Sequence, residues 1–106
     1  AHDAYDGKSL VANPGCHPTA AALALAPLAR SGVIRGVPVI DSMTGVSGAG
    51  RAKADPAYGY SELTASAMSY KVTGHRHVAE IEEQLGVAVR FTPHLVPVAR
   101  GMLAAC

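Results

Sequence analysis

The stretch "NPGCHPTAAALALAPLAR", residues 13–30, decides the fold of the first part of the chain. Its Asn-Pro-Gly start predicts a tight turn, and the alanine- and leucine-rich run behind it predicts a helix that ends near Arg30. Pro18 can occupy the first helical position, where its missing N–H costs nothing, whereas Pro27 predicts a kink or a restart of the helix. Cys16 therefore lies between a turn and the beginning of a helix.

The remaining sequence mixes strand and helix patterns without a regular strand–helix alternation. Strand-like runs cover residues 9–12, 36–45, 66–72, 87–99 and 101–105, and an amphipathic helix pattern covers residues 78–85. Pro38 argues that the first half of the second strand lies at a sheet edge or a bulge, and Pro93 and Pro97 bend or border the fourth. Gly86 stops the amphipathic helix. This order favours an α+β fold.

The composition predicts one domain with a thin core. The chain has 106 residues, the size of a single ordinary domain. Hydrophobic residues make up 49% of it, but much of that is alanine, with one Phe and no Trp to bury large areas. We therefore expect a partner domain or subunit to cover part of the apolar surface.

Charge, hydropathy and cysteine content exclude several classes of function. The formal net charge of +1 gives no field that would attract nucleic acid or acidic membranes. The chain has no 18-residue apolar run and no signal-peptide pattern at its N-terminus, so we expect a cytoplasmic location. Its two cysteines, Cys16 and Cys106, form neither a disulfide framework nor a CxxC motif.

Cys16 has two interpretations that the local sequence leaves open. The glycine before it permits a tight turn, and the orphan N–H groups and dipole of a helix N-terminus stabilise a thiolate. The same N–H groups could stabilise an oxyanion formed when the sulfur attacks a carbonyl. Alternatively, the cysteine is a small buried hydrophobe that fills a gap.

A second motif, "TGHRHVAE" at residues 73–80, places His75 and His77 on either side of Arg76. An HxH pair can bind zinc together with His94 or Cys16, but no carboxylate or cysteine lies at matching spacing, so we expect no metal site. A Cys/His couple needs no proximity in sequence, because a base on another element can take the thiol proton. Arg76 would keep the imidazoles neutral. For His77 we favour capping or packing at the helix start.

Two further segments end in a cation. The Gly/Ser-rich "TGVSGAGR", residues 44–51, can present backbone N–H groups to phosphate or carboxylate, with Arg51 as a bidentate fork. It has neither the lysine of a P-loop nor the GxGxxG order of a dinucleotide site, and such a segment can equally be a simple turn. Arg100, between two apolar runs, either reaches a cleft or ends a solvated strand.

Together these segments resemble one family. "VANPGCHPTAAALAL", "GVSGAGR", "YKVTGHRHVAEIEEQL" and "FTPHLVPVARGML" are similar, in this order, to the substrate domain of N-acetyl-gamma-glutamyl-phosphate reductases, from Val11 to Leu103. The resemblance implies a mixed, largely antiparallel sheet with helices on one face, like the C-terminal domain of glyceraldehyde-3-phosphate dehydrogenase-like enzymes. It also implies subunit contacts and hence a homo-oligomer.

The resemblance implies roles for individual residues. Cys16 matches the nucleophile that attacks the acyl phosphate to give a thioester, which NADPH reduces to the semialdehyde, and His75 matches the general acid/base. The substrate contacts would come from Ser47, Arg51, Arg76 and Arg100, and Gly48 would touch the cofactor. No metal is implied.

Departures from the family pattern qualify these expectations. His17 stands where an aromatic residue, often tyrosine, is usual, and Ala79 replaces a common proline. The GxGxxG-bearing Rossmann domain is missing, so we expect residues 1–106 to be one substrate domain taken from a longer chain and nearly inactive alone. Two alternatives stay open: an N-acetyl-aminoadipyl-phosphate reductase of lysine synthesis, and a non-catalytic module for dimerisation or folding.

Overall fold

A computed structural model describes residues 5–49 and 66–106 of the chain. Its elements are α1 (Cys16–Arg30), β1 (Val39–Thr44), the 3₁₀ turn η2 (Val46–Ala49), β2 (Met68–Ser69), α3 (His77–Leu85), β3 (Arg90–Leu95) and β4 (Met102–Ala105). The Gly/Ser-rich segment at residues 44–51 contains η2, and Arg51 lies outside the described residues.

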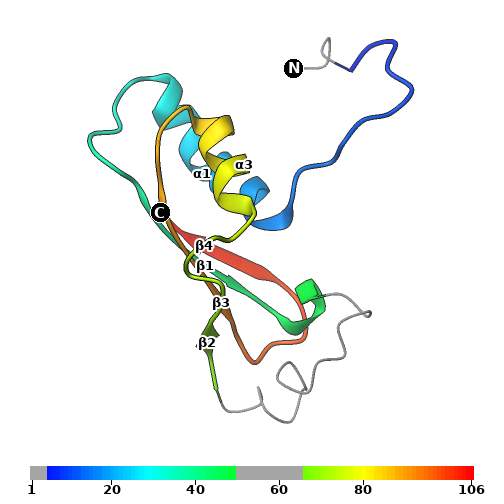
Figure 1. Ribbon diagram of the computed structural model, residues 1–106, viewed down its shortest axis with the longest axis vertical. Coiled ribbons are helices and arrows are strands. Elements are labelled where there is room, and N and C mark those ends of the chain that lie inside the picture. The colour runs from blue at the N-terminus through cyan, green and yellow to red at the C-terminus, as the bar shows by residue number, and fades with distance from the viewer. Residues whose placement is uncertain (1–4, 50–65) are drawn as a thin grey trace.

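The four strands form one mixed sheet in the order β2-β3-β1-β4. Strands β1 and β3 are parallel and bring their last residues, Thr44 and Leu95, side by side. The β1–β4 and β2–β3 pairs are antiparallel. Both described helices lie together against the sheet (Figure 1). The predicted α+β class, with a mixed sheet and helices on one face, is confirmed.

Helix α1 begins earlier than the proline rule predicted. Cys16 is its first residue, so Pro18 lies inside the first turn, where a backbone N–H has no helical partner in any case. Pro27 neither ends nor restarts the helix, which runs unbroken to Arg30. Pro27 is exposed, so the carbonyl that it leaves unpaired in the preceding turn can face solvent.

The observed strands differ from the predicted ones at residues 9–12 and around Pro38 and Pro93. Residues 9–12 form no strand, and the segment before α1 is exposed and runs outside the body of the protein (Figure 1). Pro38 precedes β1, which is an inner strand, and its carbonyl accepts a bond from the Arg90 N–H. Pro93 lies within β3 rather than at its border. Its carbonyl accepts the Tyr70 N–H on the β2 side, so its missing donor faces the two-residue β2 and leaves the β1 ladder intact.

The core lies between the helices and the sheet. It comprises Ala21, Leu25, Ile40, Ile81, Leu85, Val89 and Phe91. The alternate residues of the strands point to the other face, where Val39 is 58% and Leu103 62% exposed. The core is small, and this face of the sheet carries exposed Val39 and Leu103 beside polar residues of β1 and β3.

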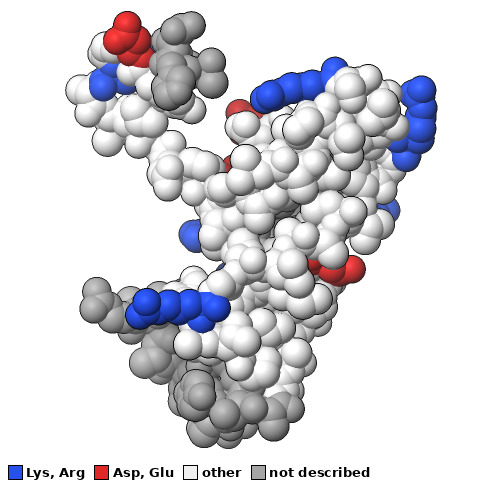
Figure 2. All heavy atoms as spheres, turned by 180° about the vertical axis from the view of Figure 1, so that it is seen from behind, with Lys and Arg blue, Asp and Glu red and all other residues white. Residues whose placement is uncertain are grey.

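The charged residues form no continuous field on the surface in view. Figure 2 shows lysine and arginine side chains at separate places on a mostly uncharged face. Within residues 5–49 and 66–106, neither helix has the length and apolarity needed to cross a membrane.

Candidate active site

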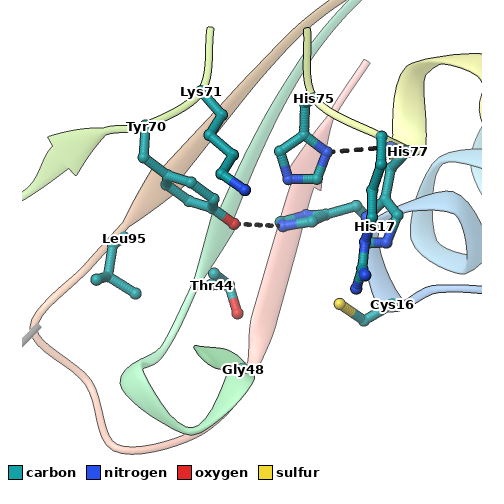
Figure 3. A pocket seen from close by; sticks show the side chains of 10 residues that line it. Cys16, His17, Thr44, Gly48, Tyr70, Lys71, His75, His77 and Leu95 are labelled. Carbon is teal, nitrogen blue, oxygen red and sulfur yellow. Dashed lines mark hydrogen bonds between the residues drawn. The ribbon is translucent and has the colours of Figure 1, made fainter. Parts of the chain in front are cut away.

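A cavity of about 260 Å³ opens where α1 and α3 begin, beside the carboxyl ends of the parallel strands. In open α/β sheets this end of the strands is the usual place for a ligand. The cavity is lined by Cys16, His17, Thr44, Gly48, Tyr70, Lys71, His75, Arg76, His77 and Leu95. Figure 3 shows Cys16, His17 and His77 on the helix side of this space and Tyr70 and Leu95 on the strand side.

The turn before α1 aims Cys16 into this cavity. Cys16 is the first residue of the helix and is exposed, and the Gly15 N–H donates to Glu80 Oε1 at 2.9 Å, which ties the turn to α3. Gly15 has an ordinary extended backbone with φ −65°. A Cβ at Gly15 would lie only 2.5 Å from His77 Nε2, so the glycine is required by close packing and not by a left-handed turn.

His17 is the centre of a cluster of rings. It is 2% exposed, and its two ring nitrogens bond to the Ser42 hydroxyl at 2.7 Å and the Tyr70 hydroxyl at 2.9 Å. The ring centroids of His75 and His77 lie 5.7 and 5.6 Å from that of His17. His17, which departs from the aromatic residue usual in the family pattern, therefore connects both helix starts to strand β1 and to Tyr70 directly after β2.

His75 is held in one tautomer by the backbone. Its Nδ1 accepts a hydrogen bond from the His77 N–H at 3.1 Å, so the neutral ring carries its proton on Nε2. His75 is buried at 8% exposure, beside His77 with ring centroids 4.8 Å apart. In this form the ring is a donor to an oxygen, and not an acceptor for a thiol proton.

His77 is the imidazole on α3 that packs next to Cys16. The Cys16 Sγ and one ring nitrogen each of His17 and His77 all lie within 4.8 Å of one another, and His75 does not belong to this group. His77 is 7% exposed, and its Nδ1 has no hydrogen-bond partner within the described part of the chain. Burial and the Arg76 charge lower the pKa of His77, while Glu80 opposes them. His77 is buried at the start of α3, where we expected it to cap or pack, and one of its ring nitrogens also lies within 4.8 Å of the Cys16 Sγ.

The imidazoles are held neutral chiefly by burial. Burial, with smaller contributions from His77 and His75, lowers the pKa of His17 to about 4. The pKa of His75 is lowered by burial first, and then by the charges of His77, Lys71 and Arg76. Arg76 acts in the direction that the sequence predicted, but desolvation is the larger cause.

The predicted site residues do not all meet in the cavity. Cys16, His75, Arg76 and Gly48 line it. Ser47 is exposed beside Gly48 on η2 and is not among the lining residues.

The two remaining arginines are not among the described residues that line the cavity. Arg100 is exposed and does not line the cavity, although its backbone packs against Gly45 just before η2. Arg51 falls in the segment that the structure does not describe.

Sequence reasoning missed five residues of the cavity. They are His17, Thr44, Tyr70, Lys71 and Leu95. Tyr70 and Lys71 lie just before the motif that contains His75, so their nearness to it along the chain could have indicated that they belong to the site. Lys71 is also the one described non-glycine residue with a positive φ, 44°, a strained conformation that often marks functional sites.

Comparison with known proteins identifies the family of the chain. The sequence profile described as "Semialdehyde dehydrogenase, dimerisation domain" matches residues 16–106. The chain belongs to this family. The dimerisation domain begins, in this match, at Cys16 itself.

The domain is also similar to part of several reductases. It is 45% identical to an "N-acetyl-gamma-glutamyl-phosphate reductase" of Methanothrix thermoacetophila over 96% of the chain and 31% of the relative. Reductases of the same name from Desulforudis audaxviator and Pelotomaculum thermopropionicum are 50% and 52% identical over 96% and 90% of the chain. These matches cover 31% and 29% of those proteins, so the chain spans about a third of the length of these relatives.

Proposed function

We propose that the chain is the substrate domain of an NADPH-dependent reductase. It would convert N-acetyl-gamma-glutamyl phosphate to N-acetyl-glutamate semialdehyde and phosphate, a step of arginine biosynthesis in the cytoplasm. The observation that carries this proposal is Cys16, placed at the first residue of α1 in a cavity that also holds His75. The names of the relatives support the choice of substrate.

The first step is acylation of Cys16. The sulfur attacks the carbonyl carbon of the acyl phosphate, the carbon–oxygen bond to phosphate breaks, and inorganic phosphate leaves as a thioester forms. Within the described residues the amides of Cys16 and His17 have no acceptor, so the start of α1 offers donors to the oxyanion. The thiol proton passes to a neutral imidazole, and His77 is the candidate on α3 within 4.8 Å of the sulfur.

His75 supplies the acid half of the chemistry. Because its Nδ1 accepts the His77 N–H, its Nε2–H is free to donate to the carbonyl oxygen as negative charge develops there. This assigns the general acid/base role expected of His75 chiefly to proton donation, with His77 as the partner base.

The anionic groups of the substrate need cations. Lys71 and Arg76 line the cavity and supply two positive charges. We retain Ser47, Arg51 and Arg100 as further proposed contacts to the carboxylate or phosphate of the substrate.

The described residues do not fit a complete nicotinamide dinucleotide. A cavity of about 260 Å³ lies below the range of pockets that enclose drug-sized ligands. Gly48 is the one residue here that we assign to the cofactor. NADPH would supply the hydride that reduces the thioester, and its binding belongs to a Rossmann domain outside residues 1–106.

A second copy of the chain would cover the open face of the sheet. On that face Met43 of β1 is paired with Leu103 of β4, and Asp41 with Ala105. Leu103 and Val39 are more than half exposed there. The family description, a dimerisation domain, supports a homo-oligomer built on this surface.

Trapping the acyl-enzyme tests the proposal. The full-length protein that carries this chain is mixed, without NADPH, with N-acetyl-gamma-glutamyl phosphate. We expect a burst of one phosphate per Cys16 and a Cys16 peptide that carries the N-acetyl-glutamyl group by mass spectrometry. Cys16→Ser should abolish the burst, whereas Cys106→Ser should retain it.

The same assay separates the alternatives. N-acetyl-aminoadipyl phosphate reacting faster than the glutamyl compound would move the substrate to lysine synthesis. A phosphate burst that survives in Cys16→Ser would refute the thioester mechanism, and an absence of any burst would favour a purely structural module.

A further inference from the structure

Cys16, His17 and His77 form a cluster of three metal-binding side chains. Sγ of Cys16 and one ring nitrogen of each histidine lie within 4.8 Å of one another. Two of the residues open α1 and the third opens α3, so the cluster exists only because the two helix starts meet. Figure 3 shows the three side chains gathered at the helix end of the cavity.

This donor set is one that zinc favours. Zinc binds thiolate sulfur at about 2.3 Å and imidazole nitrogen at about 2.0–2.1 Å, with tetrahedral geometry. Ligand atoms around one such ion lie roughly 3.5 Å apart, so the three atoms, which lie within 4.8 Å of one another, would need to approach by up to about 1 Å. Cys16 is exposed, and rotation of its short side chain can bring Sγ closer to the two ring nitrogens. We propose that Cys16, His17 and His77 form a three-ligand site for a thiophilic divalent ion such as Zn²⁺, with the fourth position open to the cavity.

The surroundings of the two histidines suit ligating rings. Metal-bound imidazoles are normally oriented through their second nitrogen by a hydrogen bond to another group. His17 has a hydroxyl on each nitrogen, Ser42 Oγ on one side and Tyr70 on the other. One hydroxyl can yield to the ion while the other keeps the ring oriented.

His77 has an unsatisfied ring nitrogen. Its Nδ1 is buried without a partner in the described part of the chain, although the residue is only 7% exposed. A buried polar group without a hydrogen bond is destabilising and calls for an explanation, of which a bound ion is one. The His77 ring packs closely against Gly15, where an added Cβ would lie 2.5 Å from Nε2.

His75 is excluded from the site by its own hydrogen bond. Its Nδ1 is already occupied by the His77 N–H, and it does not belong to the cluster. The site therefore contains the thiol but leaves the proposed proton donor free. An ion held there would occupy the sulfur and block acylation, a consequence that rests on the proposed function, whereas the binding itself does not.

Binding is measured on chelator-treated protein, with no substrate present. Zn²⁺ is titrated in competition with a chromophoric chelator, and Co²⁺ is titrated while its absorption spectrum is recorded. We expect one ion per chain and a thiolate-to-cobalt charge-transfer band. Cys16→Ser should abolish that band, and His17→Tyr and His77→Gln should each weaken Zn²⁺ binding by about tenfold or more.

Matched controls come from the same residue types elsewhere in the chain. Cys106→Ser and His94→Gln remove a thiol and an imidazole outside the cluster and should bind Zn²⁺ as the wild type does. Zn²⁺ should also protect Cys16, but not Cys106, from alkylation by iodoacetamide. His17→Tyr replaces the histidine by the residue usual at this position in the family that the sequence resembles, so it guards against a folding defect in His77→Gln.

Three results would each contradict the proposed metal site. They are no Zn²⁺ binding by the wild type, an unchanged Zn²⁺ affinity in both His17→Tyr and His77→Gln, and loss of Zn²⁺ binding in Cys106→Ser. Because acylation is assayed on metal-free protein, failure of the metal site and failure of the reductase proposal are separate outcomes.

Discussion

His17 shows how a single residue is constrained by its neighbours. The ring is almost fully buried, and both of its nitrogens are used by hydroxyls from Ser42 and Tyr70. Its ring also faces the imidazoles of His75 and His77. Protonation of His17 would place a charge in this desolvated group, which is why its pKa falls to about 4.

This burial makes stability depend on pH. In the unfolded chain His17 has its ordinary pKa of 6.5, so below that pH the unfolded state binds the proton first. The contribution of His17 to stability is complete above pH 6.5 and is lost as the pH falls toward 4. Between about pH 7.5 and about pH 5 we expect a loss of about 2 kcal/mol in the free energy of unfolding.

Denaturant unfolding at the two pH values, with chelator present, measures this loss. His17→Phe keeps a ring of similar size and should show a smaller loss, even if it is less stable at the higher pH. His75 and His77 also have lowered pKa values and contribute equally to both proteins. An equal loss in wild type and variant would contradict the assignment to His17.

Lys71 is the second residue whose role the structure revealed. It lines the cavity in a strained backbone conformation and lowers the pKa of His75 through its charge. We expect Lys71→Gln to raise KM for the acyl phosphate about tenfold with a smaller change in kcat. The reason is that the substitution removes a contact to the anion that is equally strong in the bound substrate and in the transition state. Steady-state kinetics of the full-length protein checks this, with Lys8→Gln as the control for charge alone. A fall in kcat at unchanged KM would show that Lys71 acts on the chemistry instead.

At the scale of elements, the site depends on the contact between the starts of α1 and α3. The Gly15 N–H bonds to Glu80 on α3, and the His77 ring fills the space where a Gly15 side chain would lie. The Cys16 thiol and its neighbouring imidazole are thus positioned by the packing of His77 against the Gly15 backbone.

Gly15→Ala tests this contact. The new Cβ would lie 2.5 Å from Nε2 and 2.9 Å from Cε1 of His77. We expect a loss of about 1–3 kcal/mol in the free energy of unfolding, together with a changed rate of Cys16 alkylation. Denaturant unfolding and mass-spectrometric alkylation provide the two measurements.

Gly32→Ala is the matched control. Gly32 has φ 69° and open space around it, so alanine there adds only backbone strain of about 1–2 kcal/mol at the far end of α1. Both variants should lose stability, but only Gly15→Ala should change the alkylation rate of Cys16. Identical Cys16 reactivity in all three proteins would mean that His77 does not set the position of the thiol.

At the scale of the whole molecule, one face of the sheet carries the helices and the other is open. Leu103 is 62% exposed on the open face, beside Met43 across the β1–β4 pair. If a second copy covers this face, Leu103→Arg would bury an unpaired charge and should shift the protein to monomers.

Light scattering of the full-length protein measures this shift. Leu23→Arg is the control, because Leu23 is 76% exposed on α1 and outside the sheet. We expect the control to retain the wild-type mass. An unchanged mass for Leu103→Arg would place the subunit interface elsewhere.

Much of the fold could be predicted from local patterns. Helix α3 and its end at Gly86, which has φ 69°, follow from apolar spacing and a glycine stop, and β4 matches its predicted run closely. The errors arose where tertiary pairing overrode a local rule. Pro93 lies inside β3 because its missing donor faces the short β2, and the run at residues 9–12 has no strand to pair with.

The candidate site shows the same difference between local sequence patterns and tertiary contacts. From the sequence alone it follows that Cys16 comes after a glycine turn at a helix start, that Arg76 disfavours charged imidazoles, and which family the motifs resemble. These are properties of neighbours along the chain. The central place of His17 in the ring cluster, and the position of a His77 nitrogen within 4.8 Å of the Cys16 sulfur, follow only from the three-dimensional packing. Those arrangements join residues from separate elements, and burial, which depends on the packing of all of them, is the main cause of the lowered pKa values of His17, His75 and His77.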